Sequence, residues 1–284
     1  MAVVAGATSV VHCSFITSLD GLTGDDPDAA NDGSTGNEAA TVDGGGSDSS
    51  SDSAPNDGAP YVDASPFCLN RDAAFCADFD GDGGLMSGWS GGFSDDASTS
   101  VLDTVAPVSA PYAYLSTAGP AIAGDYHQSY LYRNFTNIPP RVIVTFDLRV
   151  DHFASNDIST EAASLLLVGP IPNTAYSVQL NVGGSGSHIM EQIPLDAGTS
   201  TGVDHPLTKA ILLGVWSHVV IDVVFSPGPR TVTVTLDGAN VLDHAALAPN
   251  ANPGPFRLLL GTLYCKGPSD GFAAHYDNVT VDTP

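Results

Sequence analysis

Apolar and polar residues alternate along most of the chain after residue 98. In segment 141–150 every even position is apolar and most odd positions are polar, which is the period of a strand with one buried face. The same alternation recurs at 219–225 and at 231–236, where threonine occupies the odd positions of the second segment. These segments are therefore predicted to be half-buried β-strands.

Turn residues separate the predicted strands. Pro227-Gly228-Pro229 follows one strand, and Asp237-Gly238 is a hairpin-turn signal. Segment 242–248 is the one place where we expect a short helical turn. Further strands are predicted at 100–104, 111–116, 127–133, 161–168, 175–182, 186–191, 256–264 and 272–282. About ten to twelve short strands without long helices predict an all-β fold, an antiparallel two-sheet β-sandwich or jelly roll.

The N-terminal quarter of the chain has a different composition. Residues 14–66 contain eleven acidic residues and no Lys or Arg, set among Gly, Ser, Ala, Asn, Thr and Pro. Such a segment buries too little apolar surface to offset its chain entropy, and its charges repel one another. We therefore expect a signal-like segment at 1–13, a disordered acidic linker at 14–66 and a folded domain at 67–284.

The acidic charge limits the possible partners. The formal net charge is −24, and all eight basic residues lie at or after Arg71. Nucleic acids and anionic membranes require cationic patches, so neither is an expected partner. The charge suits solubility outside the cell and the binding of cations.

The N-terminus indicates export. Residues 2–11 form an apolar run that is too short to span a bilayer and looks like the hydrophobic region of a secretory signal. Cys13, followed by Ser14, resembles the lipobox cysteine of bacterial lipoproteins, although His12 and the lack of a preceding positive charge depart from that pattern. The resemblance implies a lipid anchor on Cys13 at the outer membrane or surface of a Gram-negative bacterium. An ordinary signal peptide or a truncated start is the alternative.

Three cysteines remain in the domain. Cys68 and Cys76 bracket a short loop, and export makes a disulfide between them plausible. Cys265 ends an apolar strand and is then expected to be a buried thiol. A pairing of Cys265 with either of the other two stays open, because the sequence does not decide between them.

Several segments in their order resemble one family of β-sandwiches. The opening 75–81 (Phe-Cys-Ala-Asp-Phe-Asp-Gly), the pair 214–221 and 232–238 with its "W-x-x-V … V-x-V-D-G" spacing, and the closing 276–281 (Tyr-Asp-Asn-Val-Thr-Val) are similar to the concanavalin A-like lectin/glucanase superfamily, laminin-G-like domains included. A galactose-binding-like jelly roll is the competing fold. The resemblance implies a lectin-like fold and says little about the ligand.

The sequence lacks the catalytic residues of the glucanases in that superfamily. Their Glu-x-Asp-x-(x)-Glu motif is absent, because neither Glu161 nor Glu191 begins such a run. Tyr130 and Tyr132 share one face of their predicted strand, and no lyase motif surrounds them. We therefore expect a non-enzymatic, surface-tethered module that binds carbohydrate or a surface protein. A polysaccharide lyase or hydrolase with an unrecognised site, and a purely structural envelope protein, are the alternatives.

Candidate binding residues follow from the chemistry of sugar sites, where aromatic rings pack against sugar faces. Trp89 and Trp216 are expected in the core, as in the resembling domains. The candidates are therefore tyrosines: Tyr112, Tyr114, Tyr126, Tyr130 and Tyr132.

A structural calcium ion is the cofactor that the resemblance implies. In resembling domains an ion lies where the first and last strands meet, and Asp277 matches the ligand of the closing strand. Asp78 and Asp80 in the opening segment are the other predicted ligands, because calcium prefers several carboxylate and carbonyl oxygens. No Glu follows at the twelfth position, so the segment is not an EF-hand loop.

Overall fold

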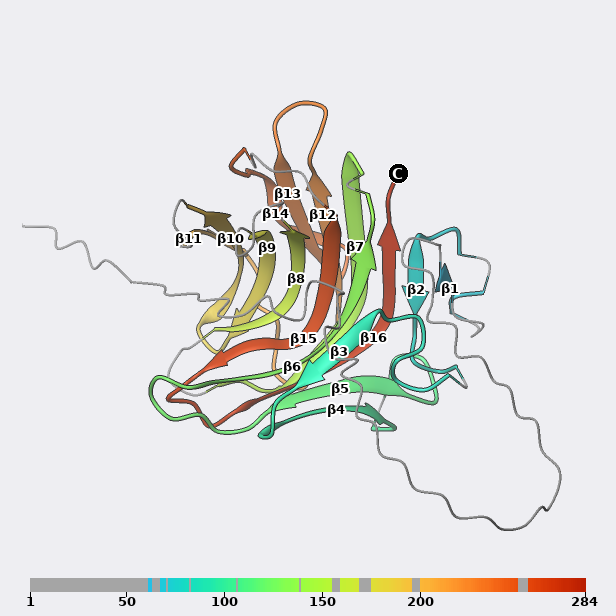
Figure 1. Ribbon diagram of the computed structural model, residues 1–284, viewed down its shortest axis with the longest axis vertical. Helices are drawn as coiled ribbons and strands as arrows, with labels where there is room; N and C mark the ends of the chain where they lie inside the picture. Colours follow the sequence, from blue (N-terminus) through green and yellow to red (C-terminus); the bar gives the residue numbers. More distant parts are fainter. Residues whose placement is uncertain are drawn as a thin grey trace, which may run out of the picture.

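In the computed structural model of the chain the described residues form two β-sheets packed face to face (Figure 1). The structure describes residues 61–62, 67–69, 71–81, 83–105, 107–137, 139–154, 159–168, 175–195, 200–249 and 255–284. Within these ranges no helix is long and apolar enough to cross a membrane. Cys13 and nearly all of the linker predicted at 14–66 lie outside the described residues.

The larger sheet has nine strands. Its main path runs β1 (Tyr61–Val62), β2 (Phe75–Ala77), β16 (Phe272–Asp282), β7 (Arg141–His152), β12 (Ser217–Val224), β13 (Thr231–Leu236) and β14 (Ala239–Ala246). Strands β4 (Ser98–Asp103) and β5 (Ala113–Ala118) extend it beside β16. The first and last strands of the domain, β2 and β16, pair antiparallel, whereas β1 pairs with β2 in parallel.

The smaller sheet has seven strands, all paired antiparallel. Its order is β11 (Ser200–Pro206), β10 (Gly186–Pro194), β9 (Ala175–Gly183), β8 (Thr160–Val168), β15 (Phe256–Lys266), β6 (Tyr126–Phe135) and β3 (Gly91–Ser94). Strands β8 and β15 are adjacent in the sheet although about ninety positions separate them in the sequence. The sequence alone therefore could not predict that these two strands pair.

The alternation in the sequence sets which residues form the core. In β7 the even positions from Val142 to Val150 are buried, and in β13 the threonines lie half-buried on the opposite face. The Tyr276 hydroxyl lies between the sheets and hydrogen-bonds to the backbone carbonyls of Ala162 and Gly261 at 2.9 and 3.0 Å. The two-sheet sandwich predicted from the sequence is thus confirmed.

Some local predictions differ from the structure. The helical turn expected at 242–248 is wrong, because those residues belong largely to β14, which closes the Asp237-Gly238 hairpin. Both turn residues have positive φ, 53° and 76°, as a type I′ turn requires. Strands β3 and β11 were not predicted, because glycine opens the first and polar residues dominate the second.

The two tryptophans differ in their environments. Trp89 is buried against Phe75 and Phe79, as expected. Trp216 is only half-buried, so its expected place in the core is wrong. It precedes Ser217, which points inward at the start of β12, and the alternation therefore turns Trp216 outward, with its ring edge near His275.

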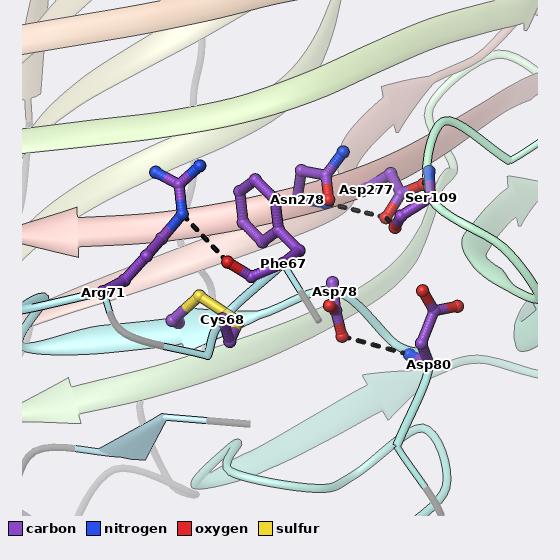
Figure 2. Close-up of a disulfide and its surroundings, with 9 residues drawn as sticks. Phe67, Cys68, Arg71, Asp78, Asp80, Ser109, Asp277 and Asn278 are labelled. Carbon is purple, nitrogen blue, oxygen red and sulfur yellow. Dashed lines mark hydrogen bonds between the residues drawn. A yellow bond between two sulfur atoms is a disulfide. The ribbon is translucent and has the colours of Figure 1, made fainter. Parts of the chain in front are cut away.

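A disulfide joins Cys68 to Cys76 (Figure 2). Phe75 and Ala77 face the core, so Cys76 between them points to the outward face of the nine-stranded sheet. Arg71 lies over the Phe67 ring at 4.0 Å and donates to the Phe67 carbonyl. The N-terminal end of the domain is thereby fastened to that outward face. Cys265 is a free, buried thiol.

Candidate ligand-binding site

The seven-stranded sheet has a polar outward face. In β9 Tyr176, Val178 and Leu180 join the core, whereas Ser177, Gln179 and Asn181 point the other way and are nevertheless buried. Their counterparts across β10 and β8 include Gln192 and Ser164, also buried. Polar side chains at this depth require hydrogen-bond partners, so their bonding indicates what the face can bind.

Two glutamine amides are bonded to each other. Gln179 Nε2 donates to Gln192 Oε1 at 3.0 Å and to Ser177 Oγ at 2.8 Å, and Gln192 Nε2 donates to Ser200 Oγ at 2.9 Å. Gln179 Oε1 and Asn181 Nδ2 are buried and have no hydrogen-bond partner among the described residues. One acceptor and one donor are therefore unsatisfied at this position.

A row of functional side chains crosses the sheet beside these amides. The strand pairing aligns His188 with Asn181, Asn181 with Glu161, and Glu161 with Tyr264. His188 Nε2 lies 3.5 Å from Asp204 Oδ1. Burial raises the pKa of the Glu161 carboxyl to about 8, so at neutral pH this carboxyl is mostly protonated and can donate a hydrogen bond.

Aromatic rings occupy the other half of the face. Tyr126 stacks on Tyr264 with ring centroids 5.2 Å apart, and Phe93 lies 5.7 Å from Tyr130. The rings come from β3, β6 and β15, so they form a contiguous band next to the polar row.

A cation extends this band. Arg257 lies 4.3 Å over the Tyr132 ring and donates to Asn134 Oδ1 at 2.6 Å. Burial raises the pKa of the Tyr130 hydroxyl, while Arg257 acts in the opposite direction. Gly91 lies opposite Tyr132, and a Cβ there would clash with the Tyr132 hydroxyl oxygen. Only glycine at position 91 leaves room for the Tyr132 side chain in this orientation.

The predicted ligand tyrosines separate into two groups. Tyr126, Tyr130 and Tyr132 lie on this face. Tyr114 is fully buried between the sheets, where its hydroxyl bonds to Ser100 at 3.0 Å, because its position in β5 faces the core. Tyr112 belongs to the segment before β5, on the other sheet.

Sequence reasoning missed the polar half of the face. The run 176–181 alternates apolar and polar residues, and this alternation marks a polar face on a buried strand. Glu161, Asn181 and Tyr264 come together only through the register of three strands, which the sequence does not reveal.

The predicted calcium ligands lie near the start of the domain (Figure 2). Asp277 accepts four hydrogen bonds: from the backbone N–H groups of Val108, Ser109 and Asn278 and from the Ser109 hydroxyl, at 2.8 to 3.0 Å. Burial raises the Asp277 pKa to about 7 although these donors favour the ionised form. Asp80 Oδ1 accepts the Tyr112 N–H at 2.8 Å, and Asp78 Oδ1 accepts the Asp80 N–H.

These hydrogen bonds tie Val108 and Ser109 to the last strand and Tyr112 to Asp80 in the opening segment. No group of three or more His, Cys, Asp or Glu side chains in the described part of the chain is arranged to hold a metal ion. A calcium ion at Asp78, Asp80 and Asp277 stays a prediction.

No protein-family model matches the sequence, and no curated protein matches it by sequence. Among solved structures, the endo-β-1,4-glucuronan lyase of the fungus Trichoderma reesei superposes with a TM-score of 0.60 at 15% identity, over 75% of this chain and 96% of its own. The domain shares the jelly-roll fold of this lyase. The jelly roll of alginate lyase vAL-1 from Chlorella virus superposes with a TM-score of 0.50 at 9% identity, over 69% of this chain and 93% of its own. At these identities the likeness concerns the fold alone, and a shared fold does not establish a shared function.

Proposed function

We propose that the jelly roll binds a polysaccharide chain on the outward face of its seven-stranded sheet. One observation carries this proposal: a band of aromatic rings lies beside a buried amide donor and a buried amide acceptor that have no partner among the described residues. Aromatic rings pack against the apolar faces of sugars, and fixed amides hydrogen-bond to their hydroxyls. The superposed structures are proteins that act on polysaccharides, which agrees with this choice of ligand.

The arrangement favours a chain over a single sugar. The aromatic band and the amide row together span all strands from β3 to β10, and neighbouring strands are about 4.8 Å apart. Several sugar units would therefore lie across the face at once. Each sugar unit would contribute a modest binding free energy, and these contributions would add along the polysaccharide.

The test is a binding screen of the full chain against neutral glucans and polyuronates, each with calcium and with a chelator. Tyr130→Ala and Tyr264→Ala are expected to weaken binding roughly tenfold each, as the loss of a stacked ring does. Tyr112→Ala, on the other sheet, is the matched control and should bind like the unaltered chain. Absence of binding to every polysaccharide would contradict the proposal.

A β-eliminating lyase is a second candidate, favoured by the row His188, Asn181, Glu161 and Tyr264. On a uronate polymer, Asn181 and the protonated Glu161 would donate hydrogen bonds to the sugar carboxylate. The His188 imidazole would take the C5 proton, the C4–O bond would break, and the Tyr264 hydroxyl would protonate the departing oxygen. The products would be a C4–C5 double bond on one fragment and a new hydroxyl on the other.

The two candidates differ in one readout. A lyase gives a conjugated, unsaturated uronate that absorbs in the ultraviolet, and His188→Ala should abolish that absorbance while leaving binding largely intact. His127→Ala is the control, because His127, at the start of β6, is hydrogen-bonded to Asp95 and lies outside the row. If the protein binds polyuronates but forms no unsaturated product from any of them, the non-enzymatic binding module is the candidate that remains.

We propose further that Cys13 carries a lipid anchor and that the domain is displayed on a bacterial surface. The lipobox-like sequence and the acidic linker support this. Mass spectrometry of the chain expressed in a Gram-negative host would detect the lipid on Cys13, and Cys13→Ser should release the protein in soluble form.

A further inference from the structure

Basic side chains are scarce on this acidic chain, and most of them are already engaged. The sequence has 32 acidic residues and only eight basic ones. Six of the basic residues are ion-paired, at least partly buried or packed on a ring away from the candidate polysaccharide face: Arg71, Arg133, Arg141, Arg149, Lys209 and Arg230. The remaining two, Arg257 and Lys266, both belong to β15, an inner strand of the seven-stranded sheet.

Lys266 points to the candidate face. Its neighbour Cys265 belongs to the core, and side chains alternate along a strand, so Tyr264 and Lys266 both face outward. The Lys266 side chain is half-buried and forms no ion pair with any described residue. Arg257, in contrast, is held over the Tyr132 ring. The ammonium group of Lys266 therefore lacks a counter-charge in the described part of the chain.

Lys266 stands at the end of the aromatic band. It lies directly across from Tyr126 in the pairing of β15 with β6, and the Tyr126 ring stacks on Tyr264 with centroids 5.2 Å apart. Two positions along a strand separate Lys266 from Tyr264, which is about 7 Å. A sugar ring that packs on the two tyrosines would therefore hold its substituents within reach of the ammonium group.

The acidic groups of this face do not supply the missing counter-charge. Glu161 is mostly protonated at neutral pH, because burial raises the pKa of its carboxyl to about 8. Asp204 lies at the far edge of the sheet, on β11, beside His188. Asp125, in the exposed segment before β6, forms no ion pair with Lys266. An anionic group on a ligand is thus the partner that this ammonium group can still bind.

We propose that Lys266 binds the anionic group of an acidic polysaccharide, a carboxylate or a sulfate ester, on the sugar unit that packs on Tyr126 and Tyr264. The inference rests on the proposed function and narrows its ligand to acidic polymers. A half-buried ammonium group has lost part of its hydration, and a charge-assisted hydrogen bond to an anion offsets that loss. The acidic remainder of the domain repels a polyanion, so the contact at Lys266 decides where such a polymer binds.

The experiment measures the affinity of the full chain for three soluble ligands of equal length: β-1,4-linked glucuronate oligomers, the matching neutral glucose oligomers, and sulfated glucose oligomers. A chelator is present throughout, so that calcium cannot bridge two carboxylates. The unaltered chain should bind at least one acidic ligand roughly tenfold more tightly than the neutral one, the effect of one charge-assisted hydrogen bond. Whichever acidic ligand binds more tightly identifies the anionic group that the site takes.

Lys266→Gln should remove this preference while leaving the affinity for the neutral oligomers unchanged, and Lys266→Arg should keep it. The salt dependence of binding to the acidic ligand should become shallower in Lys266→Gln, because one screened charge pair is lost. Lys209→Gln is the matched control, since Lys209 is paired with Asp237 on the other sheet. It should bind all three ligands like the unaltered chain.

Two results would overturn the inference: neutral oligomers that bind as tightly as the acidic ones, or an equal loss of affinity for acidic and neutral oligomers in Lys266→Gln. The second would show that Lys266 acts through packing and not through its charge. Tyr264→Ala, measured in parallel, should weaken binding of every ligand. If it does so while Lys266→Gln changes nothing, the proposed function stands and the inference fails; if no ligand binds the unaltered chain, the proposed function itself fails.

Discussion

Glu161 lies directly across from Asn181 in the pairing of β8 with β9, and its carboxyl has a pKa of about 8. The two side chains form the centre of the polar row on the candidate site. Withdrawing an ionised carboxylate from water is costly, so the half-buried Glu161 is mostly protonated at pH 7. The protonation state of Glu161 therefore affects both the hydrogen bonding at the candidate site and the stability of the domain.

Glu161→Gln should reduce the loss of stability at alkaline pH. The folded pKa is raised, so the contribution of Glu161 is fully present below about pH 4.5 and is lost as pH rises through about 8. At pH 9 the variant should be more stable than the unaltered chain by on the order of 1–3 kcal/mol, and at pH 5 the two should be similar. Urea unfolding at both pH values measures this. An equal loss of stability in both proteins would contradict the assignment.

Asp277→Ala should destabilise the domain by about 2–4 kcal/mol, because four donors on the 104–112 segment and the last strand lose their acceptor. Thermal unfolding followed by circular dichroism measures the change. Asp243→Ala, at an exposed site, is the control and should shift the midpoint little. If calcium binds here as predicted, it should raise the midpoint of the unaltered chain and not that of Asp277→Ala.

His275→Gln should lower the free energy of unfolding by about 1–3 kcal/mol, because it breaks the bridge from β4 to β7. His275 holds the pKa of Asp103 below its ordinary value, so this contribution is present above about pH 4 and is lost as pH falls through the lowered pKa. The difference between variant and unaltered chain should therefore shrink in acid. His244→Gln, whose partner Asp243 is exposed, should change the free energy of unfolding little.

Cys68→Ser with Cys76→Ser should cost about 2–3 kcal/mol, the chain-entropy value for so short a loop. The matched variant is Cys265→Ser, which changes a buried cysteine that is not part of the disulfide. Its effect on stability measures the loss of packing alone. Chemical denaturation with and without reductant separates the two effects. Insensitivity of the unaltered chain to reductant would show that the bond adds nothing to stability.

The sequence was sufficient for the sandwich because the alternation in β7, β12 and β13 carries over directly into buried and exposed faces. Tyr130 and Tyr132 were placed on one face by the same rule. Asn181 and Tyr264 could not be placed beside Glu161, because their proximity depends on pairing between strands far apart in the chain. Trp216 was assigned to the core by resemblance, although a shift of one position along its strand reverses the side to which it points.

The Cys68–Cys76 bond also decides how the domain would respond to mechanical force. A pull on the N-terminal chain reaches β1 first, which pairs with β2 in parallel. Beyond β1 the force passes from Cys68 through the sulfur atoms to Cys76 in β2. From β2 it is transmitted to the antiparallel hydrogen bonds with β16, one of the longest strands in the described part of the domain. Tension would thus be borne by a crosslink and the sheet, and the short loop between the cysteines could not unravel first.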